Sequence, residues 1–159
     1  MRTTMKRFLW FLLIIACIFG CNRSAQDAGS SSSIDYQQAK QFSDEFAIDF
    51  LHKNKQKMIA KLDPSVTQNM SQSQIDSVFD TMLSMAGTPI EITYKSSEEG
   101  YKINVGGKKP LRKFWYAVKT TKYPKGYYLF VEVVPNGKSL ASTGFFLAKF
   151  PMGAPPELQ

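Results

Sequence analysis

The spacing of the hydrophobic residues changes once along this 159-residue chain, and that change limits the fold more than any other feature. Before residue 87, apolar residues recur every three or four positions, as on one face of a helix. After residue 89 they alternate with polar residues, as in strands with one buried face. Gly87 and Pro89 mark the boundary because both residue types end helices. Helices followed by strands favour an α+β domain in which the helices cover one face of an antiparallel sheet.

Three helices are predicted before the boundary, over residues 36–51, 55–62 and 71–87. In the first, aromatic residues recur at helical spacing from Phe42 to Phe50. The second should end at Asp63 because proline follows it. The third opens on Ser71 with Gln74 three positions later, which is the pattern of a capping box.

Strands are predicted over residues 90–94, 101–105, 113–122, 127–134 and 139–150, with turns at 96–100, 123–126 and 135–137. They form a curved antiparallel sheet of four to five strands in a single domain that spans residues 34–150. Residues 151–159 are rich in proline and are expected to form an irregular tail.

The first 21 residues have the layout of a signal peptide. A basic start, Met1–Arg7, is followed by an uncharged apolar run, Phe8–Phe19, and then by Gly20 and Cys21. The run is shorter than the roughly 20 residues that a membrane-spanning helix needs. We therefore expect residues 1–20 to be a leader that is removed.

The four residues Ile18-Phe19-Gly20-Cys21 resemble the lipobox of bacterial lipoproteins. This resemblance implies lipid transfer to the Cys21 sulfur and cleavage before it, so that acyl chains hold the mature protein on a membrane. The segment ending at Cys17 also fits the motif, but cleavage there would leave apolar sequence at the new end. A retained anchor helix, in which both cysteines are ordinary apolar residues, is the other reading.

Residues 21–33 then form a lipidated cysteine and a flexible tether rich in serine. The absence of aspartate at position 22 resembles enterobacterial lipoproteins that are delivered to the outer membrane. We therefore expect a bacterial cell-envelope protein that faces the periplasm. No cysteine is left in the domain for a disulfide or a cysteine metal site, so packing must supply its stability.

The order of three helices and then strands resembles the nuclear transport factor 2-like superfamily, especially small lipid-anchored members. The residues that carry this resemblance lie at 46–51, 58–64 and 75–91. It implies a cone-shaped sheet around a pocket. In some members the pocket holds an isomerase or dehydratase site, with an Asp or His base and tyrosine donors.

Two residues could act as the base in such a site. His52 ends the first predicted helix, where a solvated position next to the helix dipole accounts for it. Glu132 is the only acidic residue between Leu111 and Phe150, but its alternation with two valines predicts that it faces solvent. The possible donors for such a pair are Tyr94, Tyr116 and Tyr128. No catalytic set can be assigned, and we expect a protein that is not an enzyme.

Metal and cofactor sites are not predicted either. Asp44, Glu45 and Asp49 lie off the aromatic face of the first helix, and a hydrated polar face explains them. The chain has no glycine-rich loop that could hold a phosphate at the start of a helix.

Charge is distributed unequally along the mature chain. Residues 87–159 contain 11 Lys/Arg against 5 Asp/Glu, whereas residues 22–86 contain 6 against 8. A positive field of this kind favours an anionic partner, either a lipid or an envelope polymer, and the export signal argues against nucleic acid. The densest cluster is Lys108, Lys109, Arg112 and Lys113. Lysines in a loop and at a strand edge can also serve solubility alone.

The sequence therefore predicts a membrane-anchored, non-catalytic binding or assembly module. Two alternatives remain open. One is a small isomerase- or dehydratase-like enzyme, for which a carboxylate–tyrosine pair in a pocket would be the sign. The other is a structural subunit of an envelope complex, which a protein partner or a homodimer would indicate.

Overall fold

The computed structural model describes residues 34–68, 70–104, 107–124 and 126–149. The predicted leader, both cysteines, the tether and the tail lie outside these ranges. Among the residues described, no helix is both long enough and apolar enough to cross a membrane.

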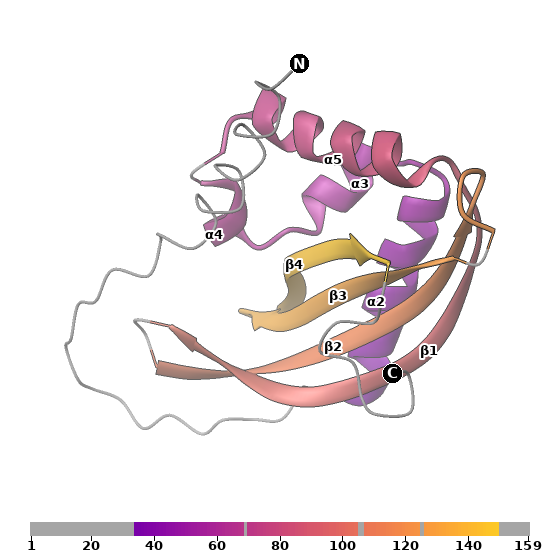
Figure 1. Cartoon of the computed structure of the whole chain (residues 1–159). Coiled ribbons are helices and arrows are strands. Elements are labelled where there is room, and N and C mark those ends of the chain that lie inside the picture. The colour runs from indigo at the N-terminus through magenta and orange to yellow at the C-terminus, as the bar shows by residue number, and fades with distance from the viewer. Residues whose placement is uncertain (1–33, 69, 105–106, 125, 150–159) are drawn as a thin grey trace, which may run out of the picture.

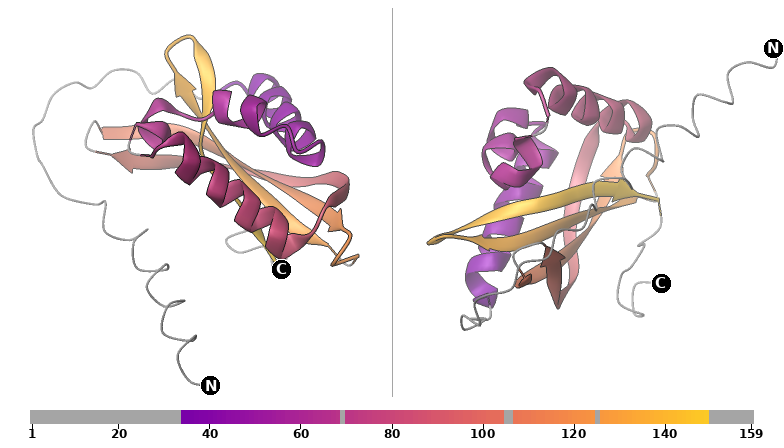
Figure 2. Two further views of the ribbon diagram at one scale, coloured as in Figure 1. Left: turned by 90° about the horizontal axis from the view of Figure 1, so that it is seen from above. Right: turned by 90° about the vertical axis from the view of Figure 1, so that its left-hand side faces the viewer.

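Within the described ranges, helices come first and strands follow (Figure 1). The helices are α2 (Tyr36–Leu51), α3 (Lys55–Ala60), α4 (Pro64–Thr67) and α5 (Gln72–Ala86). The strands are β1 (Pro89–Asn104), β2 (Gly107–Thr120), β3 (Tyr127–Asn136) and β4 (Ser139–Ala148). They form one antiparallel meander in the order β1-β2-β3-β4, and the sheet is strongly curved (Figure 2). The predicted α+β class, with helices packed on a curved antiparallel sheet, is confirmed.

Helix α2 has the predicted bounds. Its N-cap is Asp35, whose Oδ1 accepts a hydrogen bond of 2.8 Å from the backbone N–H of Gln38, which satisfies a donor that lacks a partner within the helix. Phe46 and Phe50 of the predicted aromatic face are buried, and this face packs on the sheet. Burial of this stripe orients α2 across β1, β2 and β3.

The region after α2 differs in detail from the prediction. Helix α3 ends at Ala60 instead of at residue 62, because Leu62 forms a parallel bridge with Ser142 of β4. Pro64 then opens a short helix, α4, that was not predicted, with Asp63 as its N-cap.

Helix α5 has the predicted capping box, in which Ser71 and Gln74 each bond to the other's backbone N–H. Gly87 ends this helix with φ +86°, and a Cβ there would lie 2.7 Å from the Oγ1 of Thr121, so a side chain does not fit at this turn.

The predicted turn over residues 96–100 is wrong, because β1 continues through it to Asn104. The two acidic residues of this segment lie opposite two basic residues of β2, Glu98 against Lys113 and Glu99 against Arg112. Cross-strand pairs of opposite charge favour a strand here. Because β2 starts at Gly107, the basic cluster lies in a strand and not in a loop.

The core lies between the helices and one face of the sheet. The ring centroids of Phe46 on α2 and Phe79 on α5 each lie 5.1 Å from that of Phe145 on β4. A smaller aromatic cluster lies on the other face, where Trp115 packs against Phe130. Each fully buried aromatic side chain contributes about 1.5–3 kcal/mol through removal of apolar surface from water.

Candidate functional site

The end of the β1–β2 pair extends beyond the rest of the sheet. Strand β3 pairs with β2 only between Arg112 and Val118, so the earlier residues of β2 have β1 as their only neighbouring strand. We call residues 100–104 and 107–111 the arm. It projects past the ends of β3 and β4 (Figures 1 and 2).

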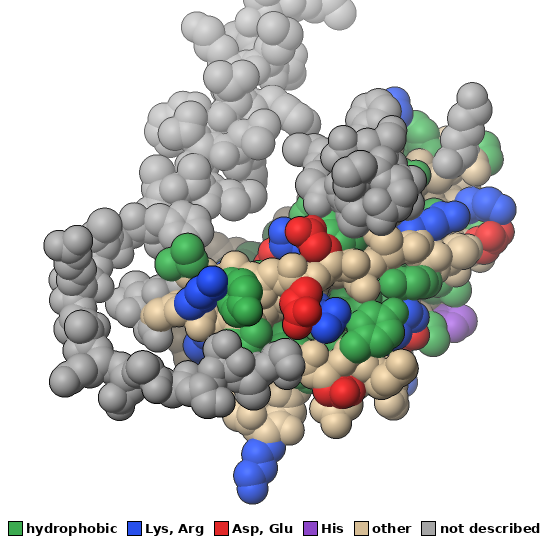
Figure 3. Space-filling model, turned by 90° about the horizontal axis from the view of Figure 1, so that it is seen from below, with side chains coloured by type: hydrophobic (Ala, Val, Ile, Leu, Met, Phe, Trp, Pro, Cys, Tyr) green, Lys and Arg blue, Asp and Glu red, His purple; other side chains and the backbone are tan. Residues whose placement is uncertain are grey.

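The arm exposes large apolar side chains next to lysines. The side chains of Ile103 and Tyr101 are 79% and 51% exposed, and the ammonium group of Lys108 lies 3.9 Å from the centre of the Tyr101 ring. These three residues share one face, because Ile103 lies opposite Lys108 and strand side chains alternate. Figure 3 shows hydrophobic and basic side chains next to each other on the left of the coloured surface, the side on which the arm lies in Figure 1.

The other face of the arm carries Lys102 directly opposite Lys109. Like charges at opposed positions repel each other and destabilise a strand pair. Glu132 of β3 relieves part of this repulsion, since its Oε2 lies 3.6 Å from the Nζ of Lys102. The arm therefore holds positive charge on both faces.

The four cations of the predicted anionic-partner site fall into two pairs. Arg112 and Lys113 are offset by glutamates: Arg112 Nη2 lies 3.3 Å from Glu99 Oε1, and Lys113 Nζ lies 4.0 Å from Glu98 Oε2. Lys108 and Lys109 are exposed and form no ion pair with a described residue. Only the second pair keeps its charge available to a partner.

Arg112 also fixes the root of the arm. Its Nε donates a hydrogen bond of 3.3 Å to the backbone oxygen of Ile34, and its guanidinium carbon lies 5.2 Å from the centre of the Tyr36 ring. This one side chain therefore links the arm, through Glu99, to the first residues of α2. Sequence reasoning missed this role because it placed Glu99 in a turn.

A carboxylate–tyrosine pair does occur, but between residues that were not predicted as partners. The Tyr116 hydroxyl on β2 lies 2.9 Å from Asp44 Oδ1 and 2.9 Å from Ser43 Oγ, both on α2. Burial raises the pKa of Tyr116 far above its usual range, so the hydroxyl stays protonated and donates. The Lys40 ammonium lies 2.6 Å from Asp44 and offsets the carboxylate charge. This arrangement holds α2 on the sheet.

The two predicted base candidates, Glu132 and His52, take no part in the contacts of Tyr116. Glu132 faces away from Val131 and Val133, as predicted, and accepts a hydrogen bond of 3.2 Å from Thr143 Oγ1. Tyr94 and Tyr116 pack together on the core face of the sheet, with 5.8 Å between their ring centroids. Of the three possible donors, only Tyr128 shares the face of Glu132. His52 is the exposed C-cap of α2, as expected for a solvated helix end.

The prediction of a hydrated polar face is wrong for one of the three acidic residues of α2. Asp49 is only 6% exposed, and its Oδ2 lies 2.5 Å from the Nζ of Lys61. Lys61 follows α3, which folds back on α2, and it also lies 3.7 Å from Glu45. A buried carboxylate needs such a partner. Within the described ranges, no three His, Cys, Asp or Glu side chains group as metal ligands would.

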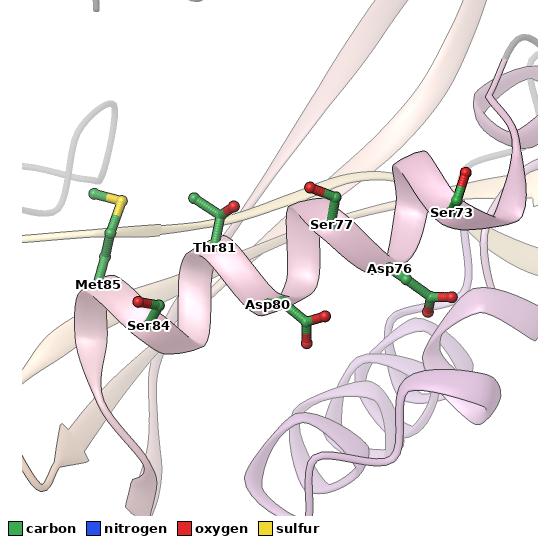
Figure 4. A pocket seen from close by; sticks show the side chains of 7 residues that line it. All are labelled: Ser73, Asp76, Ser77, Asp80, Thr81, Ser84 and Met85. Carbon is green, nitrogen blue, oxygen red and sulfur yellow. The ribbon is translucent and has the colours of Figure 1, made fainter.

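Neither of the two best-defined hollows on the described surface is lined by a tyrosine. The larger, of about 570 Å³, runs along α5 and is lined only by side chains of that helix, from Ser73 to Met85 (Figure 4). Asp76 and Asp80 in this hollow face Lys55, whose Nζ lies 2.7 Å from Asp80. The smaller, of about 210 Å³, lies between the start of α2 and the β3–β4 turn. A single helix face offers no convergent set of groups for catalysis.

No protein-family model, curated protein or solved structure matches this chain.

Proposed function

We propose that this chain is a lipoprotein of the bacterial cell envelope, anchored through Cys21 in the outer membrane and facing the periplasm. The basic start, the short apolar run and the lipobox-like residues that end at Cys21 support this assignment. The resemblance to small lipid-anchored members of the nuclear transport factor 2-like superfamily is part of the same proposal.

We further propose that the domain is a non-catalytic module that binds an anionic partner through the arm. The observation that carries this proposal is the placement of Lys108 and Lys109. Both side chains are exposed on a projecting strand pair, without an ion pair to a described carboxylate, while Arg112 and Lys113 beside them are offset by glutamates. Lysines that served solubility alone would not need a projecting arm.

The anchor is tested by labelling cells with a radioactive fatty acid. The Cys21→Ala variant should lose the label and leave the membrane fraction, because it lacks the acylated sulfur. The Cys17→Ala variant is the matched control and should keep both. Label that survives in Cys21→Ala and disappears in Cys17→Ala would move the anchor to Cys17.

Anion binding is tested with the full-length protein in phosphatidylcholine vesicles, which carry no net charge, and with soluble polyphosphate as the probe. The Lys108→Glu/Lys109→Glu variant should bind polyphosphate at least tenfold more weakly, since each exposed lysine near a polyanion contributes about 1 kcal/mol.

The matched control is Lys53→Glu/Lys57→Glu. This variant makes the same change in net charge with two exposed lysines of the helical half. It should bind polyphosphate nearly as well as the parent protein. Equal weakening in both variants would mean that net charge, and not the arm, sets the affinity.

A further inference from the structure

We propose that the arm is a second membrane contact, which docks on an anionic lipid surface. In this arrangement Tyr101 and Ile103 enter the headgroup region, while the lysines of the arm lie among lipid phosphates. The inference rests on the proposed function, because it assumes that the domain is tethered to a membrane. It adds that the anionic partner is a lipid and not a polymer.

The apolar side chains of the arm distinguish these two partners. A soluble polyanion needs cations only, whereas Ile103, at 79% exposed, is the most exposed of the large hydrophobic side chains described. Tyrosine is enriched where membrane and water meet, because its ring is apolar and its hydroxyl is polar. Lysines beside such residues can extend to phosphates while their aliphatic stems cover apolar surface. Tyr101 and Lys108 already pack in this way, with 3.9 Å between the ammonium and the ring centre.

Ile34, the first residue that the structure describes, lies next to the base of the arm. Arg112 at the root of the arm bonds to the backbone oxygen of Ile34 at 3.3 Å. Lys108 lies four residues along the strand from Arg112, or roughly 13 Å. The twelve residues from Asn22 to Ser33 can reach at most about 40 Å. A lipid on Cys21 would therefore let the arm touch the same surface without full extension of that segment.

The arrangement of charge agrees with a flat anionic surface. Lys102 and Lys109 lie opposite each other on one face of the arm, and Lys108 lies on the other face. A thin two-stranded arm that enters the headgroup layer end-on would bring both faces near phosphates. Headgroup charge would then relieve the repulsion between the two opposed lysines.

The test measures how deeply residue 103 enters the membrane. The full-length protein, purified with its anchor, is reconstituted into vesicles that contain brominated phosphatidylcholine, either with phosphatidylglycerol or without it. Bromine quenches tryptophan fluorescence only at contact range, so an Ile103→Trp variant reports contact of the arm with lipid. Ile48→Trp, on an exposed position of α2, is the matched control. Trp115, the native tryptophan that the mature protein keeps, is buried and is common to both variants.

We expect at least twofold more quenching of Ile103→Trp than of Ile48→Trp in vesicles with phosphatidylglycerol, and equal quenching of the two in pure phosphatidylcholine. Addition of Lys108→Glu/Lys109→Glu to the Ile103→Trp variant should remove the difference. Equal quenching of the two tryptophans in anionic vesicles would overturn the inference.

A second variant separates this inference from the proposed function. Ile103→Ser should leave polyphosphate binding unchanged. It should reduce contact of the arm with anionic vesicles, which is measured with a fluorophore attached to the arm. If polyphosphate binds through Lys108 and Lys109 while residue 103 never meets lipid, the partner is a polymer and only the inference fails. If the lysine reversals affect neither readout, the proposed function fails as well.

Discussion

The two ends of the β1–β2 pair share one antiparallel hydrogen-bonding pattern but differ in burial. At the inner end Phe114, Tyr116 and Val118 are buried under the helices. At the outer end the arm has the same antiparallel register, yet Tyr101 and Ile103 are mostly exposed and no third strand pairs with it. An isolated strand pair is marginally stable, so the inner end must hold the outer end in place. Packing thus selects the residues of the inner end, but it does not select the exposed residues of the arm, such as Tyr101 and Ile103.

The largest expected effect is a contrast in stability between the two ends. Phe114→Ala should lower the free energy of unfolding by about 3–5 kcal/mol, because it leaves a cavity in the core. Ile103→Ala should change it by less than about 0.5 kcal/mol, since an exposed side chain loses little packing. Urea unfolding followed by circular dichroism measures both. Similar losses in the two variants would show that the arm is part of the core.

High pH should lower the free energy of unfolding of the protein because of Tyr116, which lies at the inner end. Burial raises the pKa of this hydroxyl in the folded protein, while in the unfolded chain it titrates near its ordinary value of about 10. Below pH 10 the full stabilisation is present. Above that pH the unfolded state loses a proton that the folded state keeps, so stability falls by up to about 1.4 kcal/mol per pH unit. Tyr116→Phe should show a shallower decline between pH 10 and 11, and an unchanged slope would contradict this role.

The helices and the direction in which Glu132 points could be predicted from the sequence, because their signals are local. The aromatic spacing of α2, the Ser71–Gln74 capping box and the stop at Gly87 each depend on residues within a few positions of one another. Alternation likewise predicted that Glu132 would face away from its valine neighbours. In these places propensity, pattern and tertiary packing favour the same structure.

The arm could not be predicted in the same way, because its structure depends on partners far along the chain. Ser96–Gly100 has the composition of a turn, and only the cross-strand pairing of Glu98 and Glu99 with β2 makes it a strand. For the same reason the basic cluster was treated as one site, whereas half of it is offset by those glutamates. The Asp44–Tyr116 and Asp49–Lys61 contacts also join separate elements, so no short-range sequence pattern predicts them.

Arg112, at the junction of the two ends, should show an intermediate effect. Arg112→Ala removes the contacts with Glu99, with the backbone of Ile34 and with the Tyr36 ring, and should cost about 1–2 kcal/mol. Lys109→Ala, three residues away, should cost almost nothing. Thermal unfolding of the two variants measures the difference. If both variants unfold like the parent protein, Arg112 does not fix the arm.

The smallest expected effect is that of Lys109→Glu, which should change stability and polyphosphate binding in opposite directions. Lys109 lies directly opposite Lys102, so Lys109→Glu replaces a like-charge pair by an opposite-charge pair. Such a change on an exposed strand pair should stabilise the protein by a few tenths of a kcal/mol, in a urea titration at low salt. The same variant should bind polyphosphate more weakly, because it removes one cation and adds one anion to the arm.

Lys57→Glu is the control, since it changes an exposed lysine of α3 and should alter polyphosphate binding little. A gain in stability together with a loss of polyphosphate binding would mean that Lys109 serves binding of the partner, although it destabilises the strand pair. A Lys109→Glu variant that loses stability and keeps its affinity for polyphosphate would show the reverse. In that case the lysines of the arm would serve the strand pair itself, and the difference between its two ends would lie in packing alone.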